Sequence, residues 1–294
     1  MEPDGMIFYA VTALSANAAA VVAMPEGAGD GCDGDESSCV LVSTSGGWVA
    51  APPVPWPTVA CLDTEDALVN VGLYGHLQHL PWAGGEIRET QLPTSPALPL
   101  RVQGARRVGD LLYVCGMQRQ VLVSPDGSSW ATMNDGLEPG PDEPVTSLSN
   151  LAGNGTSLVA VGLHGSVYRS DGGPWQPLVS GVRSWLKDVA WHEGAFWICG
   201  KNGLLLTGDV RSPQKLTRIH SGTTGTLHAL KTFQGRLYAL GDNGLFRIDG
   251  TSTIPVTTPG TPRAIDVCDD ALWVVTEQRD LFVSDDGEHF ARRG

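Results

Sequence analysis

Apolar residues fall along this chain in short runs, each closed by a glycine, aspartate, asparagine or proline turn. Two representative runs are Leu111-Leu112-Tyr113-Val114 and Ala195-Phe196-Trp197-Ile198, which are aromatic-rich and each end before a Cys-Gly step. Runs of this length between turn residues predict β-strands, and no long, capped helical pattern is present. The sequence therefore predicts an all-β chain of many short strands.

One polar turn is used repeatedly. Ser124-Pro125-Asp126-Gly127-Ser128-Ser129-Trp130 recurs as Ser284-Asp285-Asp286-Gly287-Glu288-His289-Phe290 and, one residue shorter, as Ser170-Asp171-Gly172-Gly173-Pro174-Trp175. An apolar strand precedes each turn and an aromatic residue restarts the chain after it. Aspartate and serine side chains accept backbone N–H hydrogen bonds in tight turns, and glycine supplies a positive φ. A reused unit of this kind indicates a repeat architecture.

The spacing of a second turn sets the number of repeats. Aligned residues after the second strand of each unit are Gly72, Gly116, Gly162, Gly200, Gly241 and Thr276, at intervals of 44, 46, 38, 41 and 35. Four strands in about 40 residues make one propeller blade. We predict a single domain over residues 1–294, a seven-bladed β-propeller of four-stranded antiparallel blades over residues 6–51, 56–94, 99–135, 145–179, 185–220, 226–256 and 263–292. The first and last blades would then keep their own strands and meet through side chains alone.

The repeated turn resembles the Asp-box (BNR-repeat) of a group of β-propellers that includes sialidases and scaffolds of the photosystem-assembly-factor type. The usual form of that motif is Ser-x-Asp-x-Gly-x-Thr-Trp, whereas Asp126-Gly127 and Asp286-Gly287 are adjacent here. The resemblance implies a propeller in which these residues have a structural role. Sialidase chemistry is not expected, because the Arg-Ile-Pro segment near the N-terminus of such enzymes is missing and Phe246-Arg247-Ile248-Asp249 is only an echo of it.

The run from Ile7 to Met24 is apolar enough to be confused with a signal or membrane segment. Thr12, Ser15 and Asn17 interrupt it, and no basic residue precedes it. Two buried strands joined by a turn at residues 15–17 account for it better. Without an export signal we expect a cytoplasmic protein that does not insert into a membrane.

Charge is distributed unevenly in this chain of 294 residues and formal net charge -13. No lysine or arginine precedes Arg88, whereas eleven aspartates and glutamates do. Nucleic-acid backbones require clustered lysine and arginine, so no nucleic-acid partner is expected. The acidic first third either faces a basic protein or forms a solvated surface that aids solubility.

No catalytic or cofactor motif is present, and we expect no cofactor and no enzyme activity. Asp33-x-Asp35-x-Ser37 echoes part of a calcium loop, but Ser38 and Thr44 occupy the expected glycine and glutamate positions, which favours a flexible acidic insertion. His76 and His79 are better explained as polar turn residues than as a metal pair. The cysteines are expected in the core, with Cys32 and Cys39 the only plausible pair.

Function is therefore expected in the loops. Trp56 and Trp185 lie in or beside predicted inter-blade connections, and five cationic or titratable residues are expected on the same face: Arg101, Arg183, Arg263, His220 and Lys201. Tryptophan and arginine are enriched at binding hot spots. The alternative is that each packs over its own blade edge. We predict a non-catalytic protein-binding scaffold or adaptor, with a glycan-binding or degenerate sialidase-like module as the alternative.

Overall fold

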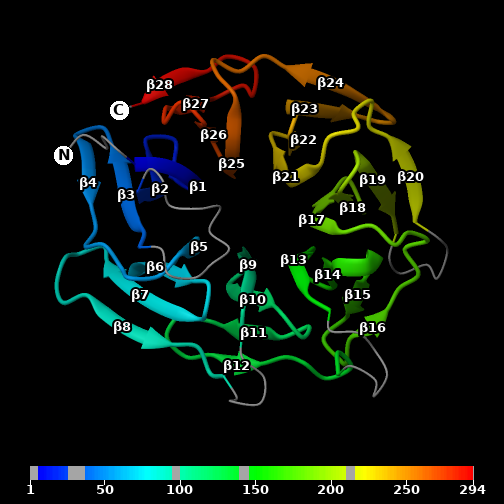
Figure 1. Ribbon diagram of the computed structural model, residues 1–294, viewed down its shortest axis with the longest axis horizontal. Helices are drawn as coiled ribbons and strands as arrows, with labels where there is room; N and C mark the ends of the chain where they lie inside the picture. Colours follow the sequence, from blue (N-terminus) through cyan, green and yellow to red (C-terminus); the bar gives the residue numbers. More distant parts are fainter. Residues whose placement is uncertain (1–5, 26–36, 95–99, 139–145, 210–215, 294) are drawn as a thin grey trace. The chain divides into compact units, whose positions relative to one another are not determined.

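The protein is a seven-bladed β-propeller in which each blade is a four-stranded antiparallel sheet (Figure 1). The computed structural model describes residues 6–25, 37–94, 100–138, 146–209 and 216–293. Strands follow one another in chain order within every sheet, and no strand is exchanged between sheets. Among the described residues the only helix is the single 3-10 turn η1 (Leu163–Gly165). The predicted fold class is confirmed.

The chain divides into two compact units, which we describe separately. Unit 1 comprises Met1–Leu92 and Val256–Gly294, and unit 2 comprises Pro93–Pro255. Unit 1 contains the first, second and seventh blades: β1 (Met6–Ser15), β2 (Ala18–Pro25), β3 (Cys39–Thr44) and β4 (Gly47–Ala50); β5 (Thr58–Asp63), β6 (Ala67–Gly72), β7 (His76–Pro81) and β8 (Arg88–Gln91); β25 (Pro262–Cys268), β26 (Ala271–Thr276), β27 (Leu281–Ser284) and β28 (Ala291–Arg293).

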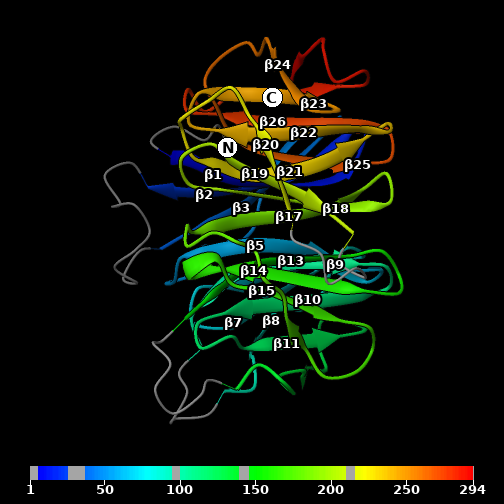
Figure 2. The same cartoon turned by 90° about the vertical axis from the view of Figure 1, so that its right-hand side faces the viewer.

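Unit 2 contains the third to sixth blades. Their strands are β9 (Val102–Val108), β10 (Leu111–Gly116), β11 (Val121–Ser124) and β12 (Ala131–Thr132); β13 (Leu148–Gly153), β14 (Leu158–Gly162), β15 (Val167–Ser170) and β16 (Gln176–Pro177); β17 (Leu186–His192), β18 (Ala195–Gly200), β19 (Leu204–Gly208) and β20 (Thr217–His220); β21 (Leu227–Phe233), β22 (Arg236–Gly241), β23 (Gly244–Asp249) and β24 (Ser252–Val256). Figure 2 shows β13, β14 and β15 layered side by side within one blade.

Each blade has two ends with different loops. At the end that we call the connection end, the first strand begins, the second strand turns into the third, and the chain passes to the next blade. At the other end, the corner end, lie the first-to-second turn and the corner before the fourth strand. Because chain order is the same in every sheet, all connections of a unit fall at the connection ends of its blades.

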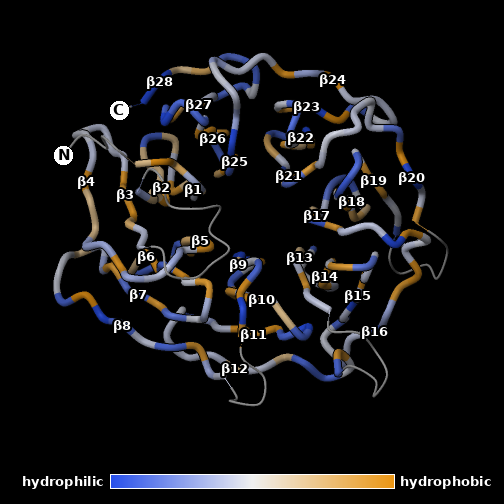
Figure 3. The backbone as a smooth tube through the Cα atoms, in the orientation of Figure 1, coloured by the Kyte–Doolittle hydropathy of each residue, from blue (hydrophilic) through white to orange (hydrophobic). Residues whose placement is uncertain are grey.

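Within each unit the sheets of neighbouring blades pack face to face, so most residues of the middle strands are apolar. Every residue of β6 and of β26 is buried, and Figure 3 shows hydrophobic and hydrophilic stretches alternating along the chain. Alternate side chains of one strand enter opposite clusters. In unit 2, for example, Phe196 and Ile198 of β18 pack toward the fourth blade, whereas Cys199 packs toward the sixth.

The repeated turn forms the blade corner as predicted. Asp126 Oδ1 accepts the backbone N–H groups of Ser128 and Ser129, both at 2.8 Å, while the Ser124 hydroxyl accepts the N–H of Gly127. Gly127 has φ 77°. These backbone hydrogen bonds hold the pKa of Asp126 below its usual value. The same arrangement recurs at Asp286, and Trp175 of the shorter copy is buried against the preceding blade, where its indole N–H binds Met133 O.

The first and last blades of unit 1 meet through side chains. Each keeps its own four strands, as predicted, and β1 lies beside β25 and β26 (Figure 1). The Asp266 carboxylate accepts the N–H of Ala13 at 2.9 Å, and the indole N–H of the fully buried Trp273 binds Ser15 O at 2.9 Å. A cluster that includes Phe8 and Val275 fills the space between the sheets. Packing and side-chain contacts, including these two hydrogen bonds and a weaker one from Arg293 to Asn17 Oδ1 at 3.4 Å, therefore close this seam.

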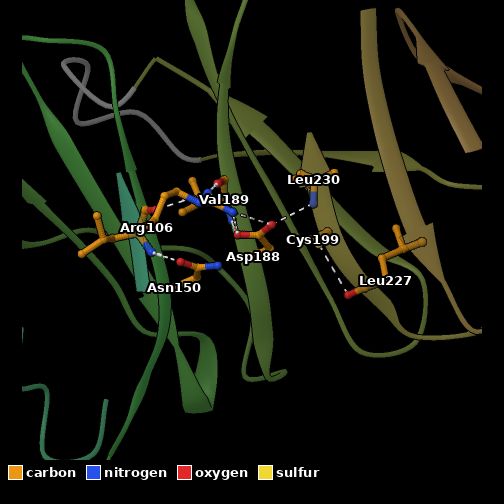
Figure 4. A network of polar contacts seen from close by, with 8 residues as sticks. Arg106, Asn150, Asp188, Val189, Cys199, Leu227 and Leu230 are labelled. Carbon is orange, nitrogen blue, oxygen red and sulfur yellow. Dashed lines mark hydrogen bonds and ion pairs between the residues drawn. The ribbon is translucent and has the colours of Figure 1, made fainter. Parts of the chain in front are cut away.

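In unit 2 a buried ion pair joins first strands of different blades (Figure 4). Arg106 of β9 donates to Leu151 O of β13 and to Val189 O of β17, and its second terminal nitrogen contacts both oxygens of Asp188 at 3.0 and 3.1 Å. The same carboxylate accepts the N–H groups of Val189 and of Leu230 on β21. The Arg106–Asp188 pair thus connects four consecutive blades.

Other sequence predictions have definite outcomes. The first apolar run forms β1 and β2 with a turn between them, and no helix among the described residues is long and apolar enough to span a membrane. Cys61, Cys115 and Cys199 are buried free thiols, and burial raises the pKa of Cys61 and of Cys115 to about 12. The interpretation of His76 and His79 as turn residues is wrong, because both lie in β7. Cys32 and the acidic residues 30–36 lie outside the described residues.

Candidate protein-binding surface

A β-bulge occurs at the same place in the first strand of every blade. In each pairing between first and second strands the register shifts by one residue just inside the connection end, and the bulged residues are Tyr9, Val59, Gln103, Ser149, Lys187, His228 and Arg263. A bulge leaves the extra residue unpaired and redirects its side chain. The fold therefore presents one differently chosen side chain per blade at the connection end.

Several of these bulged side chains contact the neighbouring blade. In unit 1, the Arg263 guanidinium lies 5.1 Å from the centre of the Tyr9 ring. In unit 2, the Ser149 hydroxyl accepts the indole N–H of Trp185 at 2.7 Å, and His228 Nε2 lies 2.6 Å from Asp242 Oδ1. The bond from His228 is the main cause of the lowered pKa of Asp242. Arg263 and Ser149 thus make contacts across blade boundaries, whereas His228 pairs with a residue of its own blade.

Two lysines converge on Trp185 in unit 2. The Lys187 ammonium lies 3.1 Å from the ring centre and that of Lys201 lies 5.1 Å from it. The whole chain has only four lysines, so half of them meet at this ring. Ammonium groups are attracted to the electron-rich face of an indole. We call Ser149, Trp185, Lys187 and Lys201 the tryptophan–lysine group.

The backbone holds this group in place. Lys201 N donates to Trp185 O at 3.0 Å, and a Cβ on Gly200 would lie 2.4 Å from the same oxygen, so glycine permits the close approach. Lys201 begins a tight turn whose central residues, Asn202 and Gly203, have φ 59° and 64°. Asn-Gly suits such a turn because both tolerate positive φ. The bulge at Lys187 and the turn at Lys201 together direct two ammonium groups at one ring.

Positive charge is exposed around this group. Arg183, Lys201 and His220 are exposed, and within the described part of the chain no carboxylate pairs with Arg183 or Lys201. Two acidic residues of the fifth and sixth blades are engaged in ion pairs: Asp188 binds Arg106, and Asp242 binds His228. The connection end of the fifth blade is therefore a local cationic surface on an acidic chain.

The structure brings some of the predicted site residues together and not others. Trp185 and Lys201 touch, and Arg183 and His220 belong to the same end of the same blade, whereas Arg101 is half-buried and its carbonyl accepts the Met117 N–H. Arg263 is exposed in unit 1. Trp56 is 7% exposed and stacks on His76 with ring centres 4.8 Å apart, so its side chain is occupied in packing and we leave it out of the surface.

Sequence analysis did not single out Lys187, Ser149, His228 or Tyr9. The sequence does contain a signal for the bulges, because the residue after each one is small or is an aspartate or asparagine. These residues are Ala10, Ala60, Gly104, Asn150, Asp188, Ala229 and Ala264. Three first strands, at 102–104, 227–229 and 262–264, begin with an apolar residue, the bulged residue and then alanine or glycine. A Cβ on Gly104 would lie 2.5 Å from Ser149 O, which gives the reason for small residues at this position.

The corner end of unit 2 carries a cleft of about 330 Å³ between the fifth and sixth blades. It is lined in part by His192, Glu193, Trp197 and Asp249. Burial lowers the pKa of His192. One tryptophan, two carboxylates and two arginines, Arg236 and Arg247, are among the residues that line this cleft, and among the described residues no group of three or more metal-ligating side chains exists.

These features define a propeller class of protein whose distinctive residues lie at the connection ends. The chain is 27% identical over 250 residues to the immune protein Tsi7 of Pseudomonas aeruginosa, covering 81% of this chain and 80% of Tsi7. No protein-family model matches the chain.

Solved structures share the fold. YCF48 bound to D1 peptide superimposes with a TM-score of 0.57 and 18% identity, covering 80% of this chain and 82% of that one. YCF48 from Cyanidioschyzon merolae has a TM-score of 0.66 at 12% identity over 97% of this chain and 95% of that one. The WD40 propeller domain of Doa1 has a TM-score of 0.66 at 14% identity, with coverages of 98% and 92%.

Proposed function

We propose that this chain is a non-catalytic, protein-binding propeller that acts as an immune protein by forming a complex with a toxic protein. The observation that best supports the proposal is the tryptophan–lysine group. In it the ammonium groups of Lys187 and Lys201 lie against the half-buried ring of Trp185, whose indole N–H is bonded to Ser149. Rigid aromatic and cationic anchors of this kind dominate binding energy at protein interfaces.

The comparisons also support a protein that acts by binding another protein. Tsi7 is similar to this chain over most of both sequences and is called an immune protein. The YCF48 propeller was solved with a D1 peptide. A protective protein that carries no catalytic constellation acts by occupying its target, and a rigid propeller does this with the loops that it positions. We propose a cytoplasmic site of action, as expected from the sequence.

Proteins encoded by genes adjacent to that of this chain are the first candidate targets. Each is produced in a host alone and together with the chain, and growth and complex formation are measured. We expect one candidate to slow growth, the chain to restore it, and the two purified proteins to elute as one complex. Restored growth without a complex, or turnover of the target by the chain, would contradict the proposal.

A matched pair of variants locates the surface. Arg183→Glu with Trp185→Ala is expected to weaken the complex roughly tenfold or more, because truncated hot-spot residues cost about 2 kcal/mol each. Arg218→Glu changes charge equally on β20 of the same blade, where Arg218 is exposed, and is expected to leave affinity unchanged. Glycan-array binding with no protein target would favour the glycan-binding alternative.

A further inference from the structure

The corner of the second blade exposes a tryptophan. All nine tryptophans of the chain lie within the described residues, and Trp82, which follows β7, is the only exposed one, at 42%. Ile87, at the other end of the same β7–β8 corner, is 37% exposed. Single exposed apolar residues are ordinary, but a large aromatic ring and a branched aliphatic side chain in one short corner are typical of an interaction site. Trp82 and Ile87 therefore mark a candidate surface in unit 1.

Hydrogen bonds hold the exposed tryptophan in place. The Trp82 indole N–H donates to Thr64 O at 3.0 Å, and the Trp82 backbone N–H donates to Asp66 O at 3.0 Å. Thr64 also fixes the β5–β6 turn, because its hydroxyl donates to Ala67 O and accepts the Ala67 N–H. The ring is thus anchored to an ordered turn while it stays exposed, so a partner that binds it has little side-chain freedom to remove.

Three exposed acids belong to the same end of the second blade. Glu65 and Asp66 lie in the β5–β6 turn, and Glu86 lies in the β7–β8 corner. Within the part of the chain that the structure describes, the side chains of these three acids take part in no ion pair or hydrogen bond. Arg88, at the start of β8, is the only lysine or arginine among residues 1–100. Acids therefore outnumber bases at this corner, and the surface is negative.

We infer that this corner binds a basic segment of a protein partner. A lysine or arginine side chain of the segment lies over the Trp82 ring, where the electron-rich indole face attracts a cation, and Glu65 and Asp66 offset its charge. An apolar side chain of the same segment packs on Ile87. Charge complementarity selects this occupant, since the whole chain carries a formal net charge of -13 that draws in a cationic partner. The corner is a second protein-binding surface, in addition to the tryptophan–lysine group of unit 2.

A fluorescently labelled peptide of repeating lysine, leucine and glycine is titrated into the full chain, and binding is followed by anisotropy. We expect binding that weakens with salt. Glu65→Gln with Asp66→Asn is expected to reduce affinity roughly threefold or more, and Trp82→Ala about two- to fivefold, as for exposed ion pairs and cation–π contacts. Asp269→Asn with Asp270→Asn neutralises two exposed acids in the equivalent β25–β26 turn of the seventh blade; it is the matched control and is expected to leave affinity unchanged. A peptide with glutamine in place of lysine is expected not to bind.

NMR locates the bound peptide on the chain. The indole N–H resonance of Trp82, assigned by its loss in Trp82→Phe, is expected to shift as the peptide is added. An unshifted resonance at saturation would overturn the inference, and so would equal weakening by the seventh-blade control, because net charge and not this corner would then attract the peptide. Spermine that displaces the peptide at equal concentration would also overturn it, because a cation without apolar side chains would then suffice. These measurements use the peptide alone, so their outcome is independent of the target bound by the tryptophan–lysine group.

Discussion

Arg106 and Asp188 form a two-point ion pair, at 3.0 and 3.1 Å, between the first strands of the third and fifth blades. The Asp188 side chain is 2% exposed and that of Arg106 is 18% exposed. Because the arginine also binds carbonyls on β13 and β17 and the carboxylate accepts the Leu230 N–H from β21, the pair connects four blades of unit 2. This relationship is structural and gives the first prediction.

Asp188→Ala is expected to lower the free energy of unfolding by about 3–5 kcal/mol, because it leaves a largely buried guanidinium without its charge partner. Urea denaturation of the purified chain measures this. A cycle with Arg106→Met and the double variant tests the pairing, since the double variant should lose less than the sum of the two single variants. Strict additivity would contradict a direct interaction.

The seam of unit 1 gives a second prediction. Trp273→Phe removes the indole donor to Ser15 O and is expected to cost about 1–2 kcal/mol in the free energy of unfolding, from a lost hydrogen bond and a small cavity. Trp130→Phe is the matched control, because that indole binds Gly127 O within its own turn and is only half-buried. A cost for Trp130→Phe equal to that for Trp273→Phe would contradict a special role for the seam.

The tight turn that begins at Lys201 gives a third prediction. A Cβ on Gly203 would lie 1.9 Å from Thr223 O, and its φ is 64°. Gly203→Ala is therefore expected to cost roughly 2 kcal/mol or more, whereas Gly155→Ala, at φ 86° with nothing within 4 Å of the added carbon, is expected to cost about 1 kcal/mol from backbone strain alone. Thermal unfolding of both variants gives the comparison, and equal costs would contradict the close approach.

The corner at Asp286 gives a pH-dependent prediction. Its carboxylate accepts the backbone N–H groups of Glu288 and His289 and lies 2.6 Å from His289 Nδ1. These bonds lower the pKa of Asp286, and the bond to Asp286 raises the pKa of His289. The aspartate contributes above its unfolded pKa of about 3.9 and the contribution is lost as pH falls through the folded value; the histidine contributes below about 6.5 and loses it as pH rises through the folded value.

Both contributions to stability are therefore fully present between about pH 4 and 6.5. Titration of His289 by NMR is expected to show a pKa above the ordinary histidine value that falls back in Asp286→Asn. Asp126→Asn, which changes the equivalent corner of the third blade, is expected to leave the His289 titration unchanged. An unchanged His289 pKa in Asp286→Asn would contradict the pairing.

Much of the fold was predictable because repeats carry their own periodicity. The turn spacing indicated seven units, and the Ser124 and Asp126 side chains form the expected corner hydrogen bonds. The four strands of each blade lie within the predicted ranges, except that β25 begins at Pro262 and β28 ends at Arg293. These features depend on the residues of each turn, so they can be predicted from the sequence alone.

The candidate site was less accessible to sequence reasoning. Trp185 and Lys201 were predicted to lie on one face, but Lys187 was not singled out, because its direction depends on a bulge that strand periodicity does not reveal. Trp56 was placed with the surface residues, although the missing Cβ of Gly72 makes room for its ring inside the second blade. Long-range packing decides which tryptophan is exposed, and a linear pattern does not encode it.

The most direct test of the account is a hydrogen-exchange footprint of the partner complex. We predict protection at residues 183–187, 201–203 and 226–228, which lie at the connection ends of the fifth and sixth blades, with no change at residues 192–194 and 249–250 at the corner ends. Protection confined to residues 192–194 and 249–250, with 183–187 and 201–203 exchanging as in the free chain, would contradict binding by the tryptophan–lysine group.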